Sequence, residues 1–361
     1  CGGKAGIRAF MDRRSAPLPT RRALPTDDPA WRGAREAEGE LLAVGAPFYP
    51  GFTPIPRWQY AHGVVRDPAT GAPRHADPVR AERELVVPVE RPGPNEALVY
   101  VLASEVNFND VWAITGIPVS PFDQHDNDHQ STGSGGVGLV VACGAEVRRE
   151  GRVGVGDLVT IYSGQSALLS PVAARDPMSA DFAIQGYETP NGSHQQFLVV
   201  QAPQLHPVPA DLTLEAAGSY VLNLGTIVRA LFTTLRIEPG RTMFVEGAAT
   251  GTGLEALKAG SKSGVRTTGL VSSAARAQAV LDAGGTGAID RTDPRWTSAF
   301  TPVPEGEAAT NAWIAQGEAL VAEYRRLNGG RLADYAVSHA GALAFPRSFQ
   351  LLAEGGTLAF Y

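Results

Sequence analysis

Residues 247–253 form a glycine-rich loop whose composition suits the binding of a dinucleotide. The loop reads Gly-Ala-Ala-Thr-Gly-Thr-Gly, follows a run typical of a buried strand (242–246) and precedes a helix-compatible run (254–262). Glycine permits a sharp turn off the strand, close approach of backbone to pyrophosphate, and tight packing of helix on strand; the helix N-terminus offers free N–H groups to phosphate. This order favours a dinucleotide site over a plain strand–turn–helix connection. The residues expected to contact the cofactor here are Gly247, Gly251, Thr252 and Gly253.

The end of the next expected strand, 266–271, indicates which dinucleotide is bound. Ser272 and Ser273 follow it directly and Arg276 lies just beyond, whereas no acidic residue occurs before Asp282. An acidic residue near this place would hold the ribose 2′-hydroxyl of NAD, but small hydroxyls and a forked guanidinium suit a 2′-phosphate. We therefore expect NADPH. The alternative is that Ser273 caps a helix and Arg276 is a solvated cation.

Histidines mark two further positions. His339 follows the expected strand 333–338, at the carboxyl end where parallel sheets bind ligands, so we expect it near the cofactor unless it is a structural histidine. His125 and His129 lie among aspartates, but on a polar loop without the paired spacing of metal ligands. We expect a solvated loop there and no metal site.

The elements that would position these residues alternate in type after residue 220. Alternating strands and helices predict a parallel sheet with helices on both faces, a Rossmann doubly wound fold, for residues 221–361. The expected strands are 242–246, 266–271, 286–289, 333–338 and 356–361, and the expected helices include 254–263, 273–283 and 313–327. Residues 84–220 instead hold short strands separated by glycine turns, which predicts a mostly β domain, a small barrel. The expected fold class is therefore α/β, with a β-barrel domain ahead of the parallel sheet.

The residues before this domain are typical of a connection. Residues 15–83 are rich in proline, which predicts an extended linker interrupted by a short helix near 31–43. Residues 1–14 have the pattern of the end of a helix. The chain begins at Cys1 rather than Met and ends inside an expected strand, so we expect an internal fragment whose sheet is incomplete at the C-terminus.

Composition argues against several classes of protein. The 361 residues are 43% hydrophobic and carry a net charge of −6 with no long basic block, which argues against nucleic acid as a partner. No apolar run reaches the length of a membrane span and no secretory signal is recognised, so the cytoplasm is the simplest compartment. Only Cys1 and Cys143 occur, too few for a disulfide framework or a four-cysteine zinc lobe.

Segments in both expected domains resemble one enzyme superfamily. A β-rich domain ahead of a Gly-Ala-x-x-Gly-x-Gly nucleotide domain is similar to the medium-chain dehydrogenases/reductases, and the scarcity of cysteine favours their zinc-free branch. Residues 106–112, Val-Asn-Phe-Asn-Asp-Val-Trp, resemble a segment of the crotonyl-CoA carboxylase/reductases, as do 118–122 and 186–189. The resemblance to the reductase domain of the propionyl-CoA synthases is closer and covers residues 84–361. Its segments are 107–123, 192–197, 244–254 and 334–341.

This resemblance implies a GroES-like catalytic domain over residues 84–220, NADPH as cofactor and a short-chain enoyl-CoA as substrate. It also implies fused acyl-CoA synthetase and hydratase domains upstream, because residues 1–14 are similar to the last helix of a crotonase-type hydratase. Relatives associate through their nucleotide domains, which makes a homodimer possible. Neither nucleic acid nor a membrane is expected as a partner.

Reduction of an enoyl-CoA sets three chemical requirements, and the resemblance suggests residues for them. A hydride must reach the β-carbon, the thioester oxygen must be stabilised as it becomes negative, and the α-carbon must gain a proton. Asn107 and Asn109 could aim amide donors at that oxygen, unless one of them only caps the following helix. Thr226 matches a threonine that relatives place near the nicotinamide, but Val228 stands where they usually carry tyrosine.

The carboxylating relatives hold carbon dioxide with an asparagine, a phenylalanine, a glutamate and a histidine. By resemblance, Asn109 matches the asparagine and Glu188 the glutamate, whereas Tyr187 replaces the phenylalanine. The histidine would lie beyond Tyr361. In a purely reductive enzyme, Tyr187 and Glu188 could hold water for proton delivery; the alternative is a solvated loop.

The expected function is therefore NADPH-dependent reduction of acrylyl-CoA to propionyl-CoA, with the fragment inactive by itself. Reductive carboxylation is one alternative, and a non-catalytic NADPH-binding relative of the quinone reductases is another. The catalytic candidates are Asn107, Asn109, Tyr187 and Glu188; the cofactor candidates are Gly247, Gly251, Thr252, Gly253, Ser272, Ser273, Arg276, Thr226 and His339.

Overall fold

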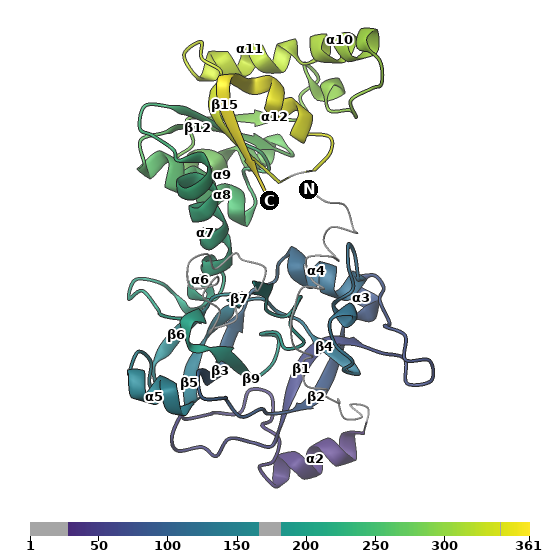
Figure 1. Cartoon of the computed structure of the whole chain (residues 1–361), viewed down its shortest axis with the longest axis vertical. Coiled ribbons are helices and arrows are strands. Elements are labelled where there is room, and N and C mark those ends of the chain that lie inside the picture. Colours follow the sequence, from purple (N-terminus) through teal and green to yellow (C-terminus); the bar gives the residue numbers. More distant parts are fainter. Residues whose placement is uncertain (1–27, 166–181, 340) are drawn as a thin grey trace. The chain divides into compact units, whose positions relative to one another are not determined.

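The computed structural model describes residues 28–165, 182–339 and 341–361. The chain divides into two compact units, Cys1–Leu222 and Asn223–Tyr361 (Figure 1). The expected helix end at 1–14 and the first part of the expected linker lie outside the described residues.

In the described part of the first unit, antiparallel strands form three sheets. The five-stranded sheet has the order β10-β6-β5-β3-β9, the three-stranded sheet has the order β2-β1-β4, and β7 pairs with β8. The strands are β1 (Trp58–Val65), β2 (Arg83–Pro88), β3 (Glu96–Ser104), β4 (His129–Ser131), β5 (Gly136–Cys143), β6 (Leu158–Ile161), β7 (Gly164–Gln165), β8 (Ala183–Ile184), β9 (Phe197–Gln201) and β10 (Leu205–Pro207). The helical segments are α2 (Pro29–Ala37), α3 (Pro78–Ala81), α4 (Phe108–Thr115), η1 (Pro121–Asp123), α5 (Ala145–Glu150), η2 (Ala202–Gln204) and α6 (Leu214–Ala217).

Alternating side chains along β3 supply two parts of this unit's core. Ala97 and Val99 belong to one buried cluster, whereas Leu98, between them, packs in another with Phe48 and Phe197. This alternation is the period-2 pattern of a strand buried on both faces. The prediction of a mostly β domain is confirmed.

The expected linker 15–83 requires a correction at its C-terminal end. Residues Trp58–Val65 form β1, the central strand of the three-stranded sheet, paired with β2 on one side and β4 on the other. Phe48 is also buried, with its ring 4.9 Å from that of Tyr100. The β-rich unit therefore begins before residue 84, because aromatic and β-branched residues outweigh the nearby prolines, none of which falls inside β1.

The second unit is built on one five-stranded parallel sheet. Its order is β13-β12-β11-β14-β15, so the chain starts in the middle, moves to one edge and then crosses to the other side. The strands are β11 (Thr242–Val245), β12 (Arg266–Val271), β13 (Gly287–Asp290), β14 (Ala333–Ser338) and β15 (Leu352–Phe360). The helical segments are α7 (Tyr220–Val228), the π-helical η3 (Arg229–Leu235), α8 (Gly251–Lys262), η4 (Ala274–Arg276), α9 (Ala277–Asp282), η5 (Thr297–Ala299), α10 (Glu307–Gln316), α11 (Glu318–Leu327) and α12 (Phe345–Leu351).

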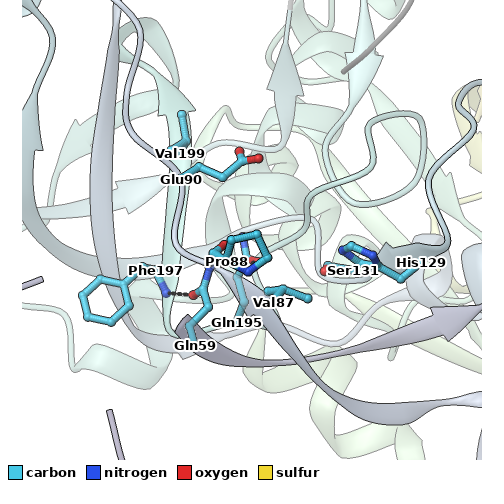
Figure 2. Close-up of a pocket in the computed structure, with 9 residues that line it drawn as sticks. All are labelled: Gln59, Val87, Pro88, Glu90, His129, Ser131, Gln195, Phe197 and Val199. Atoms are coloured by element: carbon cyan, nitrogen blue, oxygen red, sulfur yellow. Dashed lines mark hydrogen bonds between the residues drawn. The ribbon is translucent and has the colours of Figure 1, made fainter. Parts of the chain in front are cut away.

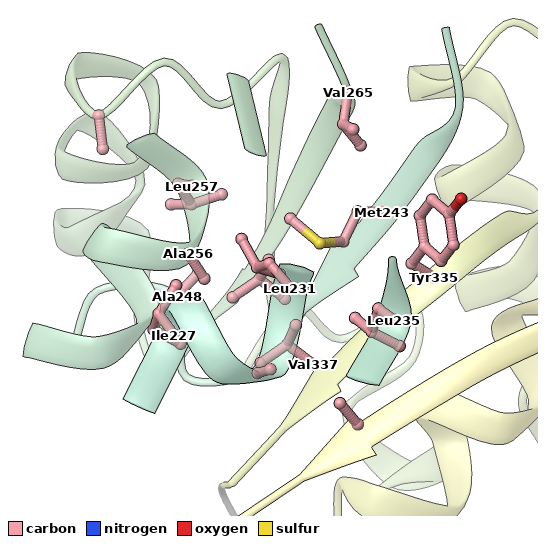
Figure 3. Close-up of a cluster of buried hydrophobic side chains, with 14 of the residues drawn as sticks. Ile227, Leu231, Leu235, Met243, Ala248, Ala256, Leu257, Val265, Tyr335 and Val337 are labelled. Atoms are coloured by element: carbon pink, nitrogen blue, oxygen red, sulfur yellow. The ribbon is translucent and has the colours of Figure 1, made fainter. Parts of the chain in front are cut away.

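Helices cover both faces of this sheet, as predicted. On β11, Met243 and Val245 face a cluster that includes Leu231 of η3 and Leu257 of α8 (Figure 3). Phe244 faces the opposite cluster, which includes Leu320 and Tyr324 of α11 and Leu351 of α12. The resulting order and layers are those of a doubly wound dinucleotide domain, which binds its ligand where β11 and β14 lie side by side and the strand order reverses.

Among the described residues, no helix has the length and apolar character needed to span a membrane.

Candidate active site

The glycine-rich loop has the geometry that a dinucleotide requires. Gly247 follows β11 with a φ of 53°, a conformation that favours glycine. A Cβ at Gly253 would lie 2.3 Å from the carbonyl oxygen of Gly247, so only glycine lets α8 pack this closely. Thr250 caps α8, its Oγ1 accepting a hydrogen bond from the Gly253 N–H (3.2 Å) and donating to the Gly247 carbonyl (2.8 Å). The helix begins at Gly251 and presents the free N–H groups of its first turn, including that of Thr252, at the end of β11.

The loop and the end of β14 meet at the point where the strand order reverses. His339 Nε2 lies 3.0 Å from Thr250 Oγ1, and His339 Nδ1 lies 3.2 Å from the hydroxyl of Tyr361. The rings of His339 and Tyr361 stack with centroids 5.2 Å apart. Burial lowers the pKa of His339, which favours the neutral imidazole. The structure thus places His339 beside the predicted cofactor loop, together with Tyr361, which sequence reasoning did not select.

The residues after β12 are available to a ligand. Ser272 and Arg276 are exposed, and among the described residues no side chain or backbone group pairs with the Arg276 guanidinium. Ser273 occupies the position before η4, but its side chain makes no capping hydrogen bond. The cap alternative for Ser273 is therefore not observed, and the group retains the chemistry that suits a 2′-phosphate.

Helix α7 adds a residue that the sequence did not indicate. A Cβ at Gly251 would lie 2.8 Å from Asn223 Nδ2, so this amide touches the start of α8. Thr226 lies one turn further along α7, on the same side of the helix as Asn223. The three-residue spacing of Asn223 and Thr226 could have indicated that both side chains lie on one side of a helix. The mostly apolar residues around them made the segment look like an ordinary core helix.

A buried carboxylate ties the strand ends together. Glu246 is completely buried directly before Gly247, and it accepts hydrogen bonds from the hydroxyls of Ser338, at the end of β14, and Ser348 of α12 (3.0 Å for the latter). This tie fixes the loop after β11 against the loop that carries His339.

In the first unit, helix α4 holds the two predicted asparagines. Asn107 caps the helix: its Oδ1 accepts the N–H of Asn109 (2.8 Å), while Asp110 accepts the N–H of Asn107 (2.7 Å). The cap reading of Asn107 is thus observed, although its Nδ2 is buried without a hydrogen-bond partner in the described chain. Asn109 is 8% exposed, and within the described ranges no hydrogen bond satisfies its side-chain amide. An amide in this state is available to bind a substrate oxygen.

Tyr187 and Glu188 lie on a packed loop rather than a solvated one. They are 5% and 6% exposed, Tyr187 donates its hydroxyl to the Val119 carbonyl (3.3 Å), and Glu188 accepts the Ile184 N–H (2.7 Å). Burial raises the pKa of Tyr187 to about 12. The ring of Trp112 lies 6.1 Å from that of Tyr187, so α4 and this loop are neighbours. The alternative of a solvated loop is wrong.

Hydrogen bonds join that loop to the segment after β4. Ser193 N–H donates to the Gly133 carbonyl and His194 N–H donates to the Thr132 carbonyl, each at 2.9 Å. Gly133 in turn donates its N–H to Asp110 of α4 (2.8 Å). The structure therefore brings Asn107, Asn109, Tyr187 and Glu188 into one set of packed segments.

The expected solvated loop around His125 and His129 is also corrected. Both histidines are buried, His125 Nε2 lies 2.7 Å from Gln130 Oε1, and His129 Nδ1 lies 2.7 Å from Asp128 Oδ1. The polar composition misled the prediction because these groups bond to one another inside the unit. In the described ranges, no group of three His, Cys, Asp or Glu side chains could hold a metal ion.

A small cavity lies elsewhere in the first unit, between β1, β2, β4 and β9 (Figure 2). Its lining includes Gln59, Val87, His129 and Gln195, but none of the predicted site residues, and its volume of about 10 Å³ suits one water molecule. We interpret it as a void in the packing.

Comparisons with known proteins agree with this division of the chain. Residues 93–210 match the family of alcohol dehydrogenase GroES-like domains. Crotonyl-CoA reductase of Streptomyces collinus is 30% identical over 304 residues, which are 79% of this chain and 65% of that protein, slightly less than two thirds of its length. The solved structure of crotonyl-CoA carboxylase/reductase AntE in complex with NADP gives a TM-score of 0.78 at 27% identity, covering 89% of this chain and 79% of that one.

A further relative establishes the family. Crotonyl-CoA carboxylase/reductase of Cereibacter sphaeroides is 33% identical over 336 residues, which are 90% of this chain and 76% of that protein. Its similarity extends through both units, from the β-rich domain with Asn109 and Glu188 to the parallel sheet with the glycine-rich loop. The chain belongs to the crotonyl-CoA carboxylase/reductase family.

Proposed function

We propose that this chain is the NADPH-dependent reductase of a short-chain enoyl-CoA and converts acrylyl-CoA into propionyl-CoA. The observation that carries the proposal is Asn109, a nine-tenths buried amide without a hydrogen-bond partner among the described residues. It lies beside the Tyr187–Glu188 loop in a chain whose other unit carries a dinucleotide loop. The solved relative in complex with NADP supports the choice of cofactor.

Each group of residues has a separate task in this proposal. NADPH supplies a hydride to the β-carbon when it is bound. Gly251 and Thr252 receive the pyrophosphate on the free N–H groups at the start of α8, and Gly247 and Gly253 keep the turn tight enough for that approach. Ser272, Ser273 and Arg276 hold the 2′-phosphate. Asn109 donates a hydrogen bond to the thioester oxygen as the oxygen becomes negative. This hydrogen bond stabilises the transition state more than the bound substrate, because the amide is already buried when the charge develops. Asn107 holds the helix start that aims Asn109, while Thr226 and His339 position the nicotinamide half.

Reductive carboxylation is the second candidate. The identity with the carboxylase/reductase of Cereibacter sphaeroides and the presence of both Asn109 and Glu188 favour it. Against it, Tyr187 brings a hydroxyl that is committed to the Val119 carbonyl where the relatives carry phenylalanine. We therefore propose that Tyr187 and Glu188 order water in this chain rather than carbon dioxide.

The upstream context belongs to the same proposal. The segments shared with the propionyl-CoA synthases support a fusion to acyl-CoA synthetase and hydratase domains, and the proposed protein is a cytoplasmic homodimer. Reading the coding sequence on either side of residue 1 tests this; a start codon beside it, with no synthetase or hydratase upstream, contradicts the fusion.

The full-length protein tests the reaction itself. NADPH oxidation is followed with acrylyl-CoA and with crotonyl-CoA, with and without bicarbonate, and the products are identified by mass spectrometry. Propionyl-CoA without dependence on bicarbonate supports the proposal, whereas methylmalonyl-CoA as the main product selects the carboxylase. NADPH binding without turnover of either thioester would instead indicate a non-catalytic relative.

A further inference from the structure

Glu105 is a buried acid that the proposed function does not use. It follows β3 directly and is 7% exposed, yet its carboxyl group makes no hydrogen bond within the described residues. Its backbone is fully engaged, since its N–H donates to the Gly135 carbonyl (3.4 Å) and its carbonyl oxygen lies 2.8 Å from His194 Nε2. The side chain packs against Gly135, where a Cβ would lie 2.6 Å from Glu105 Oε1. A carboxyl group left without partners in such a place is costly when it is ionised.

A second buried carboxyl group decides where the proton resides. Asp110 is 2% exposed and accepts the N–H groups of Asn107 and Gly133, which stabilise its ionised form. Glu105 has no such donors among the described residues, and the negative charge of Asp110 repels a negative charge on Glu105. Burial, followed by this repulsion, raises the pKa of Glu105 to about 8. Burial raises the pKa of Asp110 as well, but its two N–H donors favour the carboxylate, so Glu105 is the member of the pair that is more readily protonated at neutral pH.

The surrounding charges do not reverse that assignment. Besides Asp110, the titratable groups facing this region are His194, on the loop before β9, and Glu82, at the end of α3. His194 Nδ1 lies 2.9 Å from Thr132 Oγ1, and its Nε2 is the atom next to the Glu105 carbonyl, so neither nitrogen bonds to the Glu105 carboxyl group. Glu82 acts on Asp110, where it raises the pKa, whereas His194 lowers the pKa of Asp110, so the two influences oppose each other.

The position of this acid relates it to the asparagines. Glu105 is two residues before Asn107 and four before Asn109, at the turn from β3 into α4. Both asparagines have side-chain amide groups without partners among the described residues, at Nδ2 of Asn107 and on Asn109. The same turn thus carries amide donors for a developing negative oxygen and a protonated carboxyl group.

We propose that Glu105 is the acid that protonates the α-carbon during enoyl-CoA reduction. This inference rests on the proposed function. As the C–H bond of the reduced nicotinamide breaks and NADP⁺ is left, a C–H bond forms at the β-carbon. The π electrons of the double bond move toward the thioester, giving an enolate held by Asn109. The O–H bond of Glu105 then breaks, its proton forms the new C–H bond at the α-carbon, and the electron pair remains on the Glu105 carboxylate. Water returns the proton after turnover. The product is saturated because the enolate meets this proton rather than carbon dioxide.

The test compares E105Q with the unaltered full-length protein and with E96Q. Glu96 lies at the other end of β3, and within the described ranges its carboxylate accepts one hydrogen bond, from the Gly93 N–H (2.8 Å), so E96Q is a matched carboxyl-to-amide control. We expect E105Q to lower kcat for acrylyl-CoA reduction by about 100-fold, the size of a lost general acid, with little change in KM or in NADPH affinity. The kcat of the unaltered protein should fall above about pH 8, and E105Q should lose that decline. Unchanged kcat and an unchanged pH profile in E105Q would overturn the proposal.

Two further measurements keep the inference separate from the proposed function. The infrared difference spectrum between the unaltered protein and E105Q should contain the carbonyl stretch of a protonated carboxylic acid at pH 7, whether or not acrylyl-CoA is the substrate. Absence of that band contradicts the acid, while absence of turnover with any enoyl-CoA contradicts the proposed function. If E105Q fails to fold, E105D replaces it: a slower enzyme that keeps the high-pH decline supports the proposal, and one with full activity but no decline opposes it.

Discussion

Polar groups that are deprived of both water and partners are the most informative residues of this chain. Most buried polar groups in proteins are hydrogen-bonded, so each exception suggests a ligand or a chemical task. Asn109 and Glu105 are such exceptions in the first unit. Arg276 is their exposed counterpart in the second, a guanidinium that pairs with no group in the described chain. Together these three residues match the needs of an oxyanion, a proton and a phosphate.

Arg276 should decide between the two nicotinamide cofactors. We expect R276A to raise the KM for NADPH about 10- to 100-fold, which corresponds to the loss of one charge-assisted hydrogen bond to phosphate. The KM for NADH should stay unchanged. R266A is the control, because Arg266 begins the same strand at its opposite end and its guanidinium donates to the Leu327 carbonyl (3.2 Å) as its one partner in the described part of the chain. Steady-state kinetics with both cofactors measure the ratio. Equal losses with NADPH and NADH would remove Arg276 from the 2′-phosphate site.

Asn109 should affect the chemical step more than binding. Replacement by alanine removes a donor whose interaction strengthens as the thioester oxygen becomes negative, so we expect kcat to fall about 100- to 1,000-fold with KM changed only a few-fold. Asn109→Asp keeps the size of the side chain but presents a negative charge to the oxygen and should be at least as slow. NADPH titration verifies that the second unit is intact. A variant that loses affinity for the thioester but keeps kcat would assign Asn109 to substrate binding alone.

Sequence patterns located these residues better than they described their surroundings. The glycine spacing and the Ser272–Arg276 segment could be recognised from local order, because loop and helix terminus are contiguous in the chain; their contacts with the cofactor stay a prediction. The burial of Tyr187, Glu188 and His125 was not, since it depends on segments far apart in sequence that pack on one another. Glu105 escaped notice for the same reason: only the structure places its carboxyl group beside that of Asp110.

Among the elements of the second unit, the connection from β11 to α8 has little tolerance for change. Its loop closes so tightly that a Cβ at Gly253 would lie 2.3 Å from a backbone oxygen, which cannot move as a flexible side chain would. We expect Gly253→Ala to displace the start of α8 and lower NADPH affinity at least about 10-fold, while the first unit stays folded. The start of α8 has to shift because an added methyl group would press against backbone, and such overpacking typically costs about 1–3 kcal/mol. Isothermal titration with NADPH measures the loss.

Gly33→Ala provides the comparison for that change. Gly33 lies in α2, and a Cβ there meets nothing within 4 Å. We expect this variant to keep full NADPH affinity and to stabilise α2 slightly, as alanine does in a helix. If Gly253→Ala bound NADPH as tightly as Gly33→Ala, the close packing of α8 on the loop would not matter for the cofactor.

The boundaries of helices and strands could be predicted from the sequence only where local breaking residues, glycine and proline, coincide with the ends of buried segments. The expected helix 313–327 is two helices, α10 and α11, that meet at Gly317. A Cβ at Gly317 would lie 2.5 Å from a guanidinium nitrogen of buried Arg347, so the break serves a tertiary contact that local propensity cannot reveal. The strand Trp58–Val65 was missed because proline density outweighed its alternating pattern. The parallel strands were placed well because continuous apolar runs are typical of a buried parallel sheet.

At the scale of the whole molecule, pH and cofactor should act on different units. Each unit has its own buried clusters, those around Val99 in the first and around Met243 in the second. NADPH binds the second unit in the proposed function, so at 100 times its Kd it should stabilise that unit by about 2.7 kcal/mol. Glu105, by contrast, belongs to the first unit.

The sign of the pH effect follows from the raised pKa of Glu105. The native first unit keeps a proton on Glu105 up to about pH 8, whereas the unfolded chain loses it near the ordinary pKa of a glutamate. Between those values the native state binds more protons at Glu105. The contribution of Glu105 to the free energy of unfolding is therefore highest below the ordinary pKa and decreases as pH rises, by up to about 1.4 kcal/mol per pH unit. E105Q cannot titrate and should lose this slope. Denaturant unfolding of both proteins between pH 6 and pH 8, with and without NADPH, isolates the difference. The proposal is contradicted if the free energy of unfolding changes with pH equally in the two proteins. It is also contradicted if the pH dependence belongs to the unfolding transition that NADPH stabilises, because Glu105 lies in the first unit.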